Sequence, residues 1–221
     1  MMTPDYQRAA IAATEMLIKH NINTAPVIPL PVFKRTPGCI VLSFTELSGR
    51  IGMDRNNLIT MFDEENHDAV TSTHFEDGKI RYLVTYNQRV PLYLLQRALA
   101  RELGHIVLGH DGVTRPQDVR MAEAVCFAHH LISPRPVLHL LQSSGMPLTM
   151  NVLSGTTGCS DECVDEMQTI PGAHVAPDLN AAVRDLFAPH LNEYIAFHRS
   201  SPKVDRSPVV DFGTFMDNYT E

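Results

Sequence analysis

Glu102 and His105 are the residues whose types and spacing most clearly allow chemistry. They lie in segment 100–110, which reads Ala-Arg-Glu-Leu-Gly-His-Ile-Val-Leu-Gly-His. On a helix, the pattern His-Glu-x-x-His places two imidazoles on one face, where they hold a zinc ion while the glutamate reaches the metal-bound water. Here the glutamate and the second histidine are present, but Arg101 occupies the first histidine position. Because a guanidinium offers no lone pair, Arg101 cannot bind zinc.

A second segment, residues 123–134, adds a further carboxylate, Glu123, and reads Glu-Ala-Val-Cys-Phe-Ala-His-His-Leu-Ile-Ser-Pro. Together the two segments resemble the paired motifs of the ImmA/IrrE family of metallopeptidases. In that family the first motif reads Ala-His-Glu-Leu-Gly-His and the second reads Glu-Ala-x-x-Phe-Ala-x-x-Leu-Leu-x-Pro. The resemblance covers roughly residues 5–140. Weaker matches to the family are Tyr86-Asn87, Arg97 and segment 212–216.

The resemblance implies a zinc site in which His105 and Glu123 are metal ligands and Glu102 is the general base. The zinc would lower the pKa of a bound water to roughly 7 and polarise the scissile carbonyl. The resemblance also implies a protein partner, a helix-turn-helix repressor that often controls phage or mobile-element genes.

Arg101 departs from this family pattern and divides the functional prediction in two. Two ligands bind zinc more weakly than three, and the guanidinium can take the place of the metal by pairing with Glu123 or Glu102. One reading is a zinc endopeptidase that cleaves a repressor. The other, which Arg101 favours, is a catalytically silent relative that binds a protein partner through the former cleft.

His110 is the best substitute for the missing histidine, because a helix that ends at Gly109 frees it to fold back toward the site. His130 is a poorer substitute, since it lies roughly 10 Å along the helix axis from Glu123 by standard geometry. We expect His129 and His130 to be partly solvated.

Two acidic features are weaker candidates for a metal site. Asp111 has the spacing of a third ligand in some extended zinc motifs, but Leu108 stands where those motifs need glycine. The run Asp63-Glu64-Glu65 is more typical of a solvated loop than of a metal site.

The four cysteines are Cys39, Cys126, Cys159 and Cys163. Cys159 and Cys163 stand four apart and could supply half of a metal site. A zinc site normally needs a second such pair or suitably spaced histidines. Small buried thiols are therefore the favoured interpretation.

Proline, glycine and the apolar periodicity predict the elements that position these residues. We expect a first helix to about His20 with Thr3 as N-cap, an extended connection over 21–37 and a buried strand at 40–42. A hairpin of 69–75 and 80–85 should then form around Asp77-Gly78, followed by a helix from Pro91 to about Gly109 and a second from Pro116 to Ile132. The remainder should contain short helices, including one capped by Ser160, and an irregular end from about Pro202.

These elements predict an α+β fold of the zincin type, with a small antiparallel sheet packed on a helical bundle. We expect a metallopeptidase-type domain over residues 1–140, with a helical and irregular extension over 141–221 packed on it. The chain has 221 residues, which suits this size.

Charge and hydropathy weigh against several function classes. The net charge is −7, from 25 acidic and 18 basic residues, which disfavours direct binding to nucleic acid. No apolar run approaches the roughly 20 residues of a membrane helix, and the first residues lack the pattern of a signal peptide. The sequence therefore predicts a cytoplasmic protein with reduced thiols.

Overall fold

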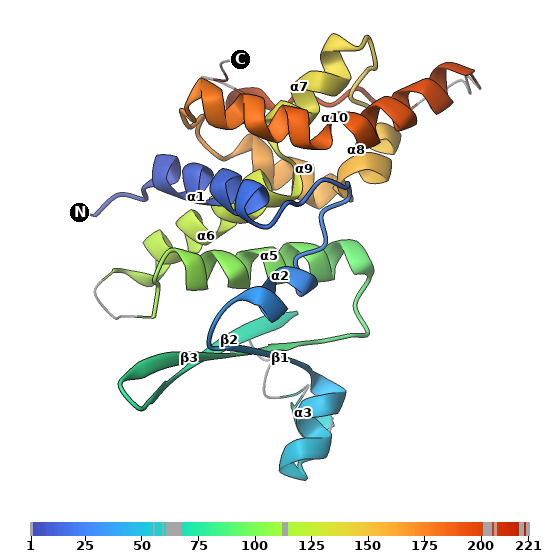
Figure 1. Cartoon of the computed structure of the whole chain (residues 1–221). Coiled ribbons are helices and arrows are strands. Elements are labelled where there is room, and N and C mark those ends of the chain that lie inside the picture. Colours follow the sequence, from blue (N-terminus) through green and yellow to red (C-terminus); the bar gives the residue numbers. More distant parts are fainter. Residues whose placement is uncertain are drawn as a thin grey trace.

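The computed structural model of this chain describes residues 2–54, 56–58, 60, 68–111, 115–200, 205, 207–216 and 219. A three-stranded sheet lies at one end, and helices are stacked above it in successive layers (Figure 1). This arrangement confirms the predicted α+β class. The acidic run at residues 63–65 lies outside the described residues.

The sheet consists of β1 (Cys39–Ser43), β2 (Ala69–Glu76) and β3 (Lys79–Tyr86), in the order β1-β3-β2. The predicted hairpin is confirmed: β2 and β3 are antiparallel, and the turn residues Asp77 and Gly78 both have positive φ, 51° and 72°. Two consecutive positive φ values define the turn that suits the twist of a hairpin. The prediction of an antiparallel sheet is wrong in one respect, because β1 runs parallel to β3 and makes the sheet mixed.

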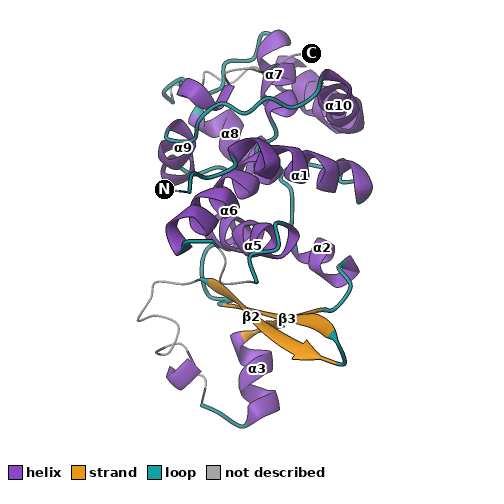
Figure 2. Ribbon diagram, turned by 90° about the vertical axis from the view of Figure 1, so that its left-hand side faces the viewer, coloured by secondary structure: helices purple, strands orange, loops and turns teal. Residues whose placement is uncertain are grey.

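The first helices depart from prediction at their starts. Helix α1 (Tyr6–Lys19) is capped by Asp5, whose carboxylate accepts a hydrogen bond from the Arg8 amide at 2.9 Å, so the predicted cap Thr3 is wrong. The segment expected to be extended contains α2 (Leu30–Arg35), which tolerates Pro31 because its first turn leaves amides unbonded anyway. Helix α3 (Phe44–Ile51) follows β1 directly and lies below the sheet (Figure 2).

The two motif helices form as predicted. Helix α5 (Leu92–Val107) carries the first motif and contacts β2 and β3, whereas α6 (Gln117–Ile132) carries the second and packs between α5 and α1. The helices approach closely at Gly104, where an added Cβ atom would lie 3.0 Å from Cδ1 of Phe127 and 3.2 Å from the carbonyl oxygen of Ala124. This glycine therefore sets the spacing between the two motifs.

We expect Gly104→Ala to lower the free energy of unfolding by about 1–3 kcal/mol, since overpacking at the α5–α6 contact outweighs the higher helix propensity of alanine. Gly49→Ala is the matched control: Gly49 also lies in a helix, but its added Cβ atom would have no neighbour within 4 Å. That substitution should be neutral or stabilising by up to about 1 kcal/mol. Equal stability of the two variants in urea unfolding would contradict a close approach at Gly104.

The C-terminal part is more helical than predicted. It contains α7 (Arg135–Ser143), α8 (Met150–Thr157), α9 (Asp161–Gln168), α10 (Pro177–Ser200) and the short 3₁₀ helix η1 (Gly213–Met216). The predicted Ser160 cap is confirmed, because its hydroxyl accepts from the Cys163 amide. The long helix α10, which continues through Pro189, was not predicted, and it packs on α7 and α1.

A single large core cluster joins these layers and runs from Ala9 to Phe215 in the sequence. Helices α1 and α6 lie between the sheet-side helix α5 and the C-terminal helices (Figure 1). The division of the chain near residue 140 stays a prediction. None of the helices within the described ranges combines the length and hydrophobicity needed to cross a bilayer.

Candidate functional site

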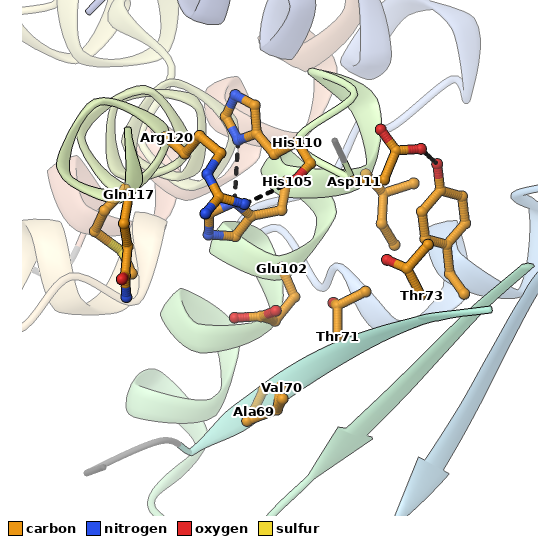
Figure 3. Close-up of a pocket in the computed structure, with 13 residues that line it drawn as sticks. Ala69, Val70, Thr71, Thr73, Glu102, His105, His110, Asp111, Gln117 and Arg120 are labelled. Atoms are coloured by element: carbon orange, nitrogen blue, oxygen red, sulfur yellow. Dashed lines mark hydrogen bonds between the residues drawn. The ribbon is translucent and has the colours of Figure 1, made fainter. Parts of the chain in front are cut away.

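A cavity of about 220 Å³ lies between β2, α5 and the start of α6 (Figure 3). Glu102 and His105 reach it from α5, while Thr71 and Thr73 border it from β2. The remaining lining residues are Ala69, Val70, Tyr82, Ile106, His110, Asp111, Gln117, Arg120 and Met121. The fold therefore places the residues of the first motif against an edge strand of the sheet.

The structure brings His105, His110 and Glu123 together in one chain of hydrogen bonds. Nδ1 of His105 lies 3.0 Å from Nδ1 of His110, and Nε2 of His110 lies 2.9 Å from Oε2 of Glu123. The side chains of His110 and Glu123 are each only 1% exposed. His110 thus does meet the predicted ligands, as its position beyond α5 suggested.

Gly109 allows the backbone to turn back after α5, so that His110 reaches the site. Its φ of 66° ends the helical path, and the amide of His110 then donates to the carbonyl of His105 at 2.9 Å. The Arg120 guanidinium on α6 donates to the carbonyl of His110 at 3.0 Å. These two backbone contacts hold the His110 ring between the two motif helices.

Glu123 is occupied by protein partners on both of its oxygens. Oε2 accepts from His110, whereas Oε1 accepts from the amide of Asp5 at 2.9 Å and forms a close ion pair with Arg115. Arg115 was not identified from the sequence as a partner of Glu123. Its position just before α6, about two helical turns before Glu123, could have suggested this pairing. The Asp5 amide carries no such signal, because it comes from the distant N-terminal segment.

Arg101 pairs with Glu102 and not with Glu123. Its Nε atom lies 3.6 Å from Oε1 of Glu102, and its side chain is 22% exposed. The same Nε atom is buried without a hydrogen-bond partner among the described residues. The sequence left open whether Arg101 pairs with Glu102 or with Glu123, and in the structure it pairs with Glu102 through a single contact. The charge of Glu123 is neutralised by Arg115 instead.

The hydrogen-bond partners determine which ring nitrogens of His105 and His110 carry a proton. Because the Glu123 carboxylate only accepts, Nε2–H of His110 donates to it, and Nδ1 of His110 must accept from Nδ1–H of His105. Burial lowers the pKa of His105 to about 4, with smaller contributions from His110, Arg101 and Arg120. Burial also lowers the pKa of His110, against the raising effect of Glu123. Both rings are neutral near pH 7, and His105 keeps an unprotonated Nε2 as an acceptor.

As arranged, these residues do not fit one zinc ion. His110 presents different ring nitrogens to His105 and Glu123, so one ion cannot replace both hydrogen bonds unless a ring turns. Within the described ranges, no three His, Cys, Asp or Glu side chains form a group that could hold a metal. Arg101 and Arg115 also place positive charge next to the carboxylates that an ion would need.

The weaker candidates take other roles in the structure. The Asp111 carboxylate accepts a hydrogen bond from the Tyr82 hydroxyl at 3.1 Å. His129 and His130 are 0% and 3% exposed, so the expectation that they are partly solvated is wrong. Both lie on α6, which is enclosed by α1, α5 and α9, and neither lines the cavity.

Comparison of the chain with models of known families, with curated proteins and with solved structures found no match. The likeness to the ImmA/IrrE family therefore depends on the motif residues themselves, above all Glu102, His105 and Glu123.

Proposed function

We propose that this protein is a catalytically silent relative of the ImmA/IrrE metallopeptidases that binds an extended segment of a protein partner. The segment lies along β2 in the cavity below α5, and the family resemblance suggests a helix-turn-helix repressor as its source. The observation that carries this proposal is the occupied state of Glu123, whose two oxygens serve Arg115, His110 and the Asp5 amide.

A carboxylate bound in this way is a structural anchor. Zinc would have to displace an arginine and a histidine from a carboxylate that is 1% exposed, and the neighbouring Arg101 adds a further positive charge. Breaking a buried, hydrogen-bonded ion pair costs several kcal/mol, which two remaining ligands on α5 and α6 offset poorly. The site is therefore stable without a metal.

The edge strand supports binding of an extended peptide. Among the described strands, β2 pairs only with β3. In a hairpin with a two-residue turn, the residues next to the turn exchange hydrogen bonds, and bonded pairs alternate along the strands. The Asn87 amide donates to the Asp68 carbonyl at 2.8 Å, in agreement with this alternation. The backbone groups of Thr71 and Thr73 consequently point to the free edge, where a peptide can add a strand.

The wall of the cavity favours a peptide side chain that donates hydrogen bonds. Glu102 and His105 both line this wall, and His105 offers the unprotonated Nε2 as an acceptor. The Thr71 hydroxyl is buried and has no hydrogen-bond partner within the part of the chain that the structure describes. A lysine, arginine or asparagine side chain of the partner would donate hydrogen bonds to Nε2 of His105 and to the Thr71 hydroxyl.

Binding is tested by titrating fluorescently labelled helix-turn-helix repressors from the same genome with the protein. Thr71→Pro removes an outward-facing amide without breaking the ladder to β3. We expect it to weaken repressor binding about tenfold, because it removes one hydrogen bond to the peptide and disturbs the fit of the peptide against the strand. Thr71→Ser is the matched control, because it keeps both the amide and the hydroxyl, and it should bind within about threefold of the parent protein.

The repressor should remain intact on prolonged incubation with the protein. Cleavage that Glu102→Gln abolishes would overturn the catalytically silent reading, whatever the binding result. Equal binding by the Thr71→Pro and Thr71→Ser proteins would instead overturn docking along β2.

Zinc endopeptidase activity is the second candidate. The convergence of His105, His110 and Glu123, with Glu102 on the same cavity, favours it. It requires His110 to turn so that a single nitrogen replaces the missing ligand at position 101. The same incubation separates the two candidates, since only an endopeptidase shortens the repressor.

A further inference from the structure

A second group of reactive side chains lies at the start of α9, on the other side of α6 from the sheet. Cys159 precedes the helix cap Ser160, and Cys163 lies in the first turn. Their sulfur atoms are 2.6 Å apart, and the two residues are 1% and 3% exposed. Such a separation already approaches bonding distance, since a disulfide bond measures about 2.05 Å.

A histidine and a carboxylate accompany the two thiols. Nδ1 of His129 lies 3.6 Å from the Cys163 sulfur, and Nε2 of His129 lies 2.8 Å from Oε2 of Glu166. Because the carboxylate accepts from Nε2–H, Nδ1 is left as an acceptor that faces Cys163. Arg97 on α5 lies 3.6 Å from the same Glu166 oxygen and helps to hold it. The imidazole is thus oriented to take a proton from Cys163.

The two cysteines differ in access. A cavity of about 370 Å³ is lined by Cys159, but Cys163 is not among the described residues that line it. The other lining residues are Tyr93, Met150, Asn151, Ser154, Ser160, Asp161 and Glu162. A small molecule in this cavity therefore lies next to Cys159 and is separated from Cys163.

We propose that Cys159 and Cys163 form a thiol–disulfide exchange site that takes small organic disulfides through this cavity. Cys159 is the attacking thiol, Cys163 is the resolving thiol, and His129 is the base that serves Cys163. The proposal is independent of peptide binding at β2.

The exchange proceeds in two balanced steps. The Cys159 thiolate attacks one sulfur of a disulfide RSSR, so that a Cys159–S–S–R bond forms and RS⁻ leaves. Cys163 then gives its proton to Nδ1 of His129 and attacks the Cys159 sulfur, which releases a second RS⁻. The two protons lost by the protein end on two RSH molecules. The protein dithiol is oxidised by two electrons, and the small disulfide is reduced.

The hydrogen bonds around the sulfurs agree with these roles. The bond from Cys163, with smaller contributions from Ser133 and Thr157, lowers the pKa of Cys159 despite its burial. The pKa of Cys163 is raised by its bond to Cys159 and by burial. The remaining thiols differ, because burial raises the pKa of Cys39 to about 11 and that of Cys126 to about 12.

The cavity also predicts which disulfides react. Asp161 and Glu162 are exposed on its wall, so cationic disulfides should be favoured over anionic ones. We expect cystamine to oxidise the reduced protein at least about threefold faster than dithiodiglycolic acid at low salt, with a smaller difference at high salt.

The reduced protein is tested with cystamine, followed by intact mass and peptide mapping. The expected product has lost two hydrogen atoms, carries a 159–163 crosslink and returns to the dithiol with excess reductant. Cys163→Ser should stop at a mixed disulfide on Cys159, and Cys159→Ser should give neither product at α9. Cys39→Ser is the matched control and should still form the crosslink. His129→Asn should slow release of the second thiol without slowing the first attack.

Three results would overturn the proposal. One is reaction of cystamine at Cys39 or Cys126 in preference to Cys159. Another is an equal or faster reaction with the anionic disulfide. The third is a stoichiometric metal ion in the purified protein that is lost in Cys159→Ser, since that would make the thiols metal ligands. A protein that exchanges disulfides but binds no repressor would leave this site standing and remove the function proposed for the β2 cavity.

Discussion

Arg101→His is expected to raise the affinity of this protein for zinc at least about a hundredfold. The substitution removes the positive charge paired with Glu102 and completes two imidazoles on one face of α5, four residues apart. Changes in groups that only orient metal ligands already alter metal affinity by about 10- to 100-fold, so the gain of a ligand should be larger. The added histidine would give zinc the means to compete with Arg115 and His110 for Glu123.

Zinc affinity is measured by competition with a chromophoric chelator, supported by elemental analysis of protein purified without chelator. Arg101→Lys is the matched control, because it keeps the charge and offers no imidazole, and its affinity should stay at the level of the parent protein. Glu123→Gln in the Arg101→His background should remove most of the gain, which assigns the ion to this site and not to the thiols near α9. A parent protein that holds one zinc ion through His105 and Glu123 would contradict the expectation.

Glu123→Ala is expected to lower the free energy of unfolding by about 3–5 kcal/mol, the usual cost of removing one partner of a buried ion pair. The loss leaves Nε2–H of His110 and the Asp5 amide without an acceptor, and it leaves Arg115 without its counter-charge. The Arg115 side chain is 31% exposed and can turn toward water, which places the expected value at the lower end. The N-terminal segment and α6 should loosen together, since Glu123 joins them.

The stability change is measured by urea unfolding followed by circular dichroism. Glu123→Gln keeps the shape and one acceptor, so it should cost less, about 1–3 kcal/mol. Asp118→Ala, which removes an exposed acid from the first turn of the same helix, should cost no more than about 1 kcal/mol. A Glu123→Ala protein as stable as Asp118→Ala would show that Glu123 is not the structural anchor described here. Such a result would instead favour Glu123 as a metal ligand.

The sequence by itself determined the elements whose signals are local. Asp77-Gly78 specified the hairpin because two positive φ values need such residues, and Pro91, Gly109 and Pro116 limited the two motif helices. The spacing of Glu102 and His105 fixed their common helix face in the same way. The position of His110 beyond Gly109 was enough to predict that it could fold back to the site.

Only the tertiary structure decided how distant segments meet. The parallel pairing of β1 with β3, the Asp5 amide on Glu123 and the choice of Glu102 as partner of Arg101 all depend on contacts between elements. Burial of His129 and its placement between Cys163 and Glu166 likewise required α9 to pack on α6. Local propensity acts over a few residues, whereas these contacts are selected by packing a whole core. The motif could therefore place Glu102 and His105 on one helix face, but the partners of its carboxylates had to come from the fold.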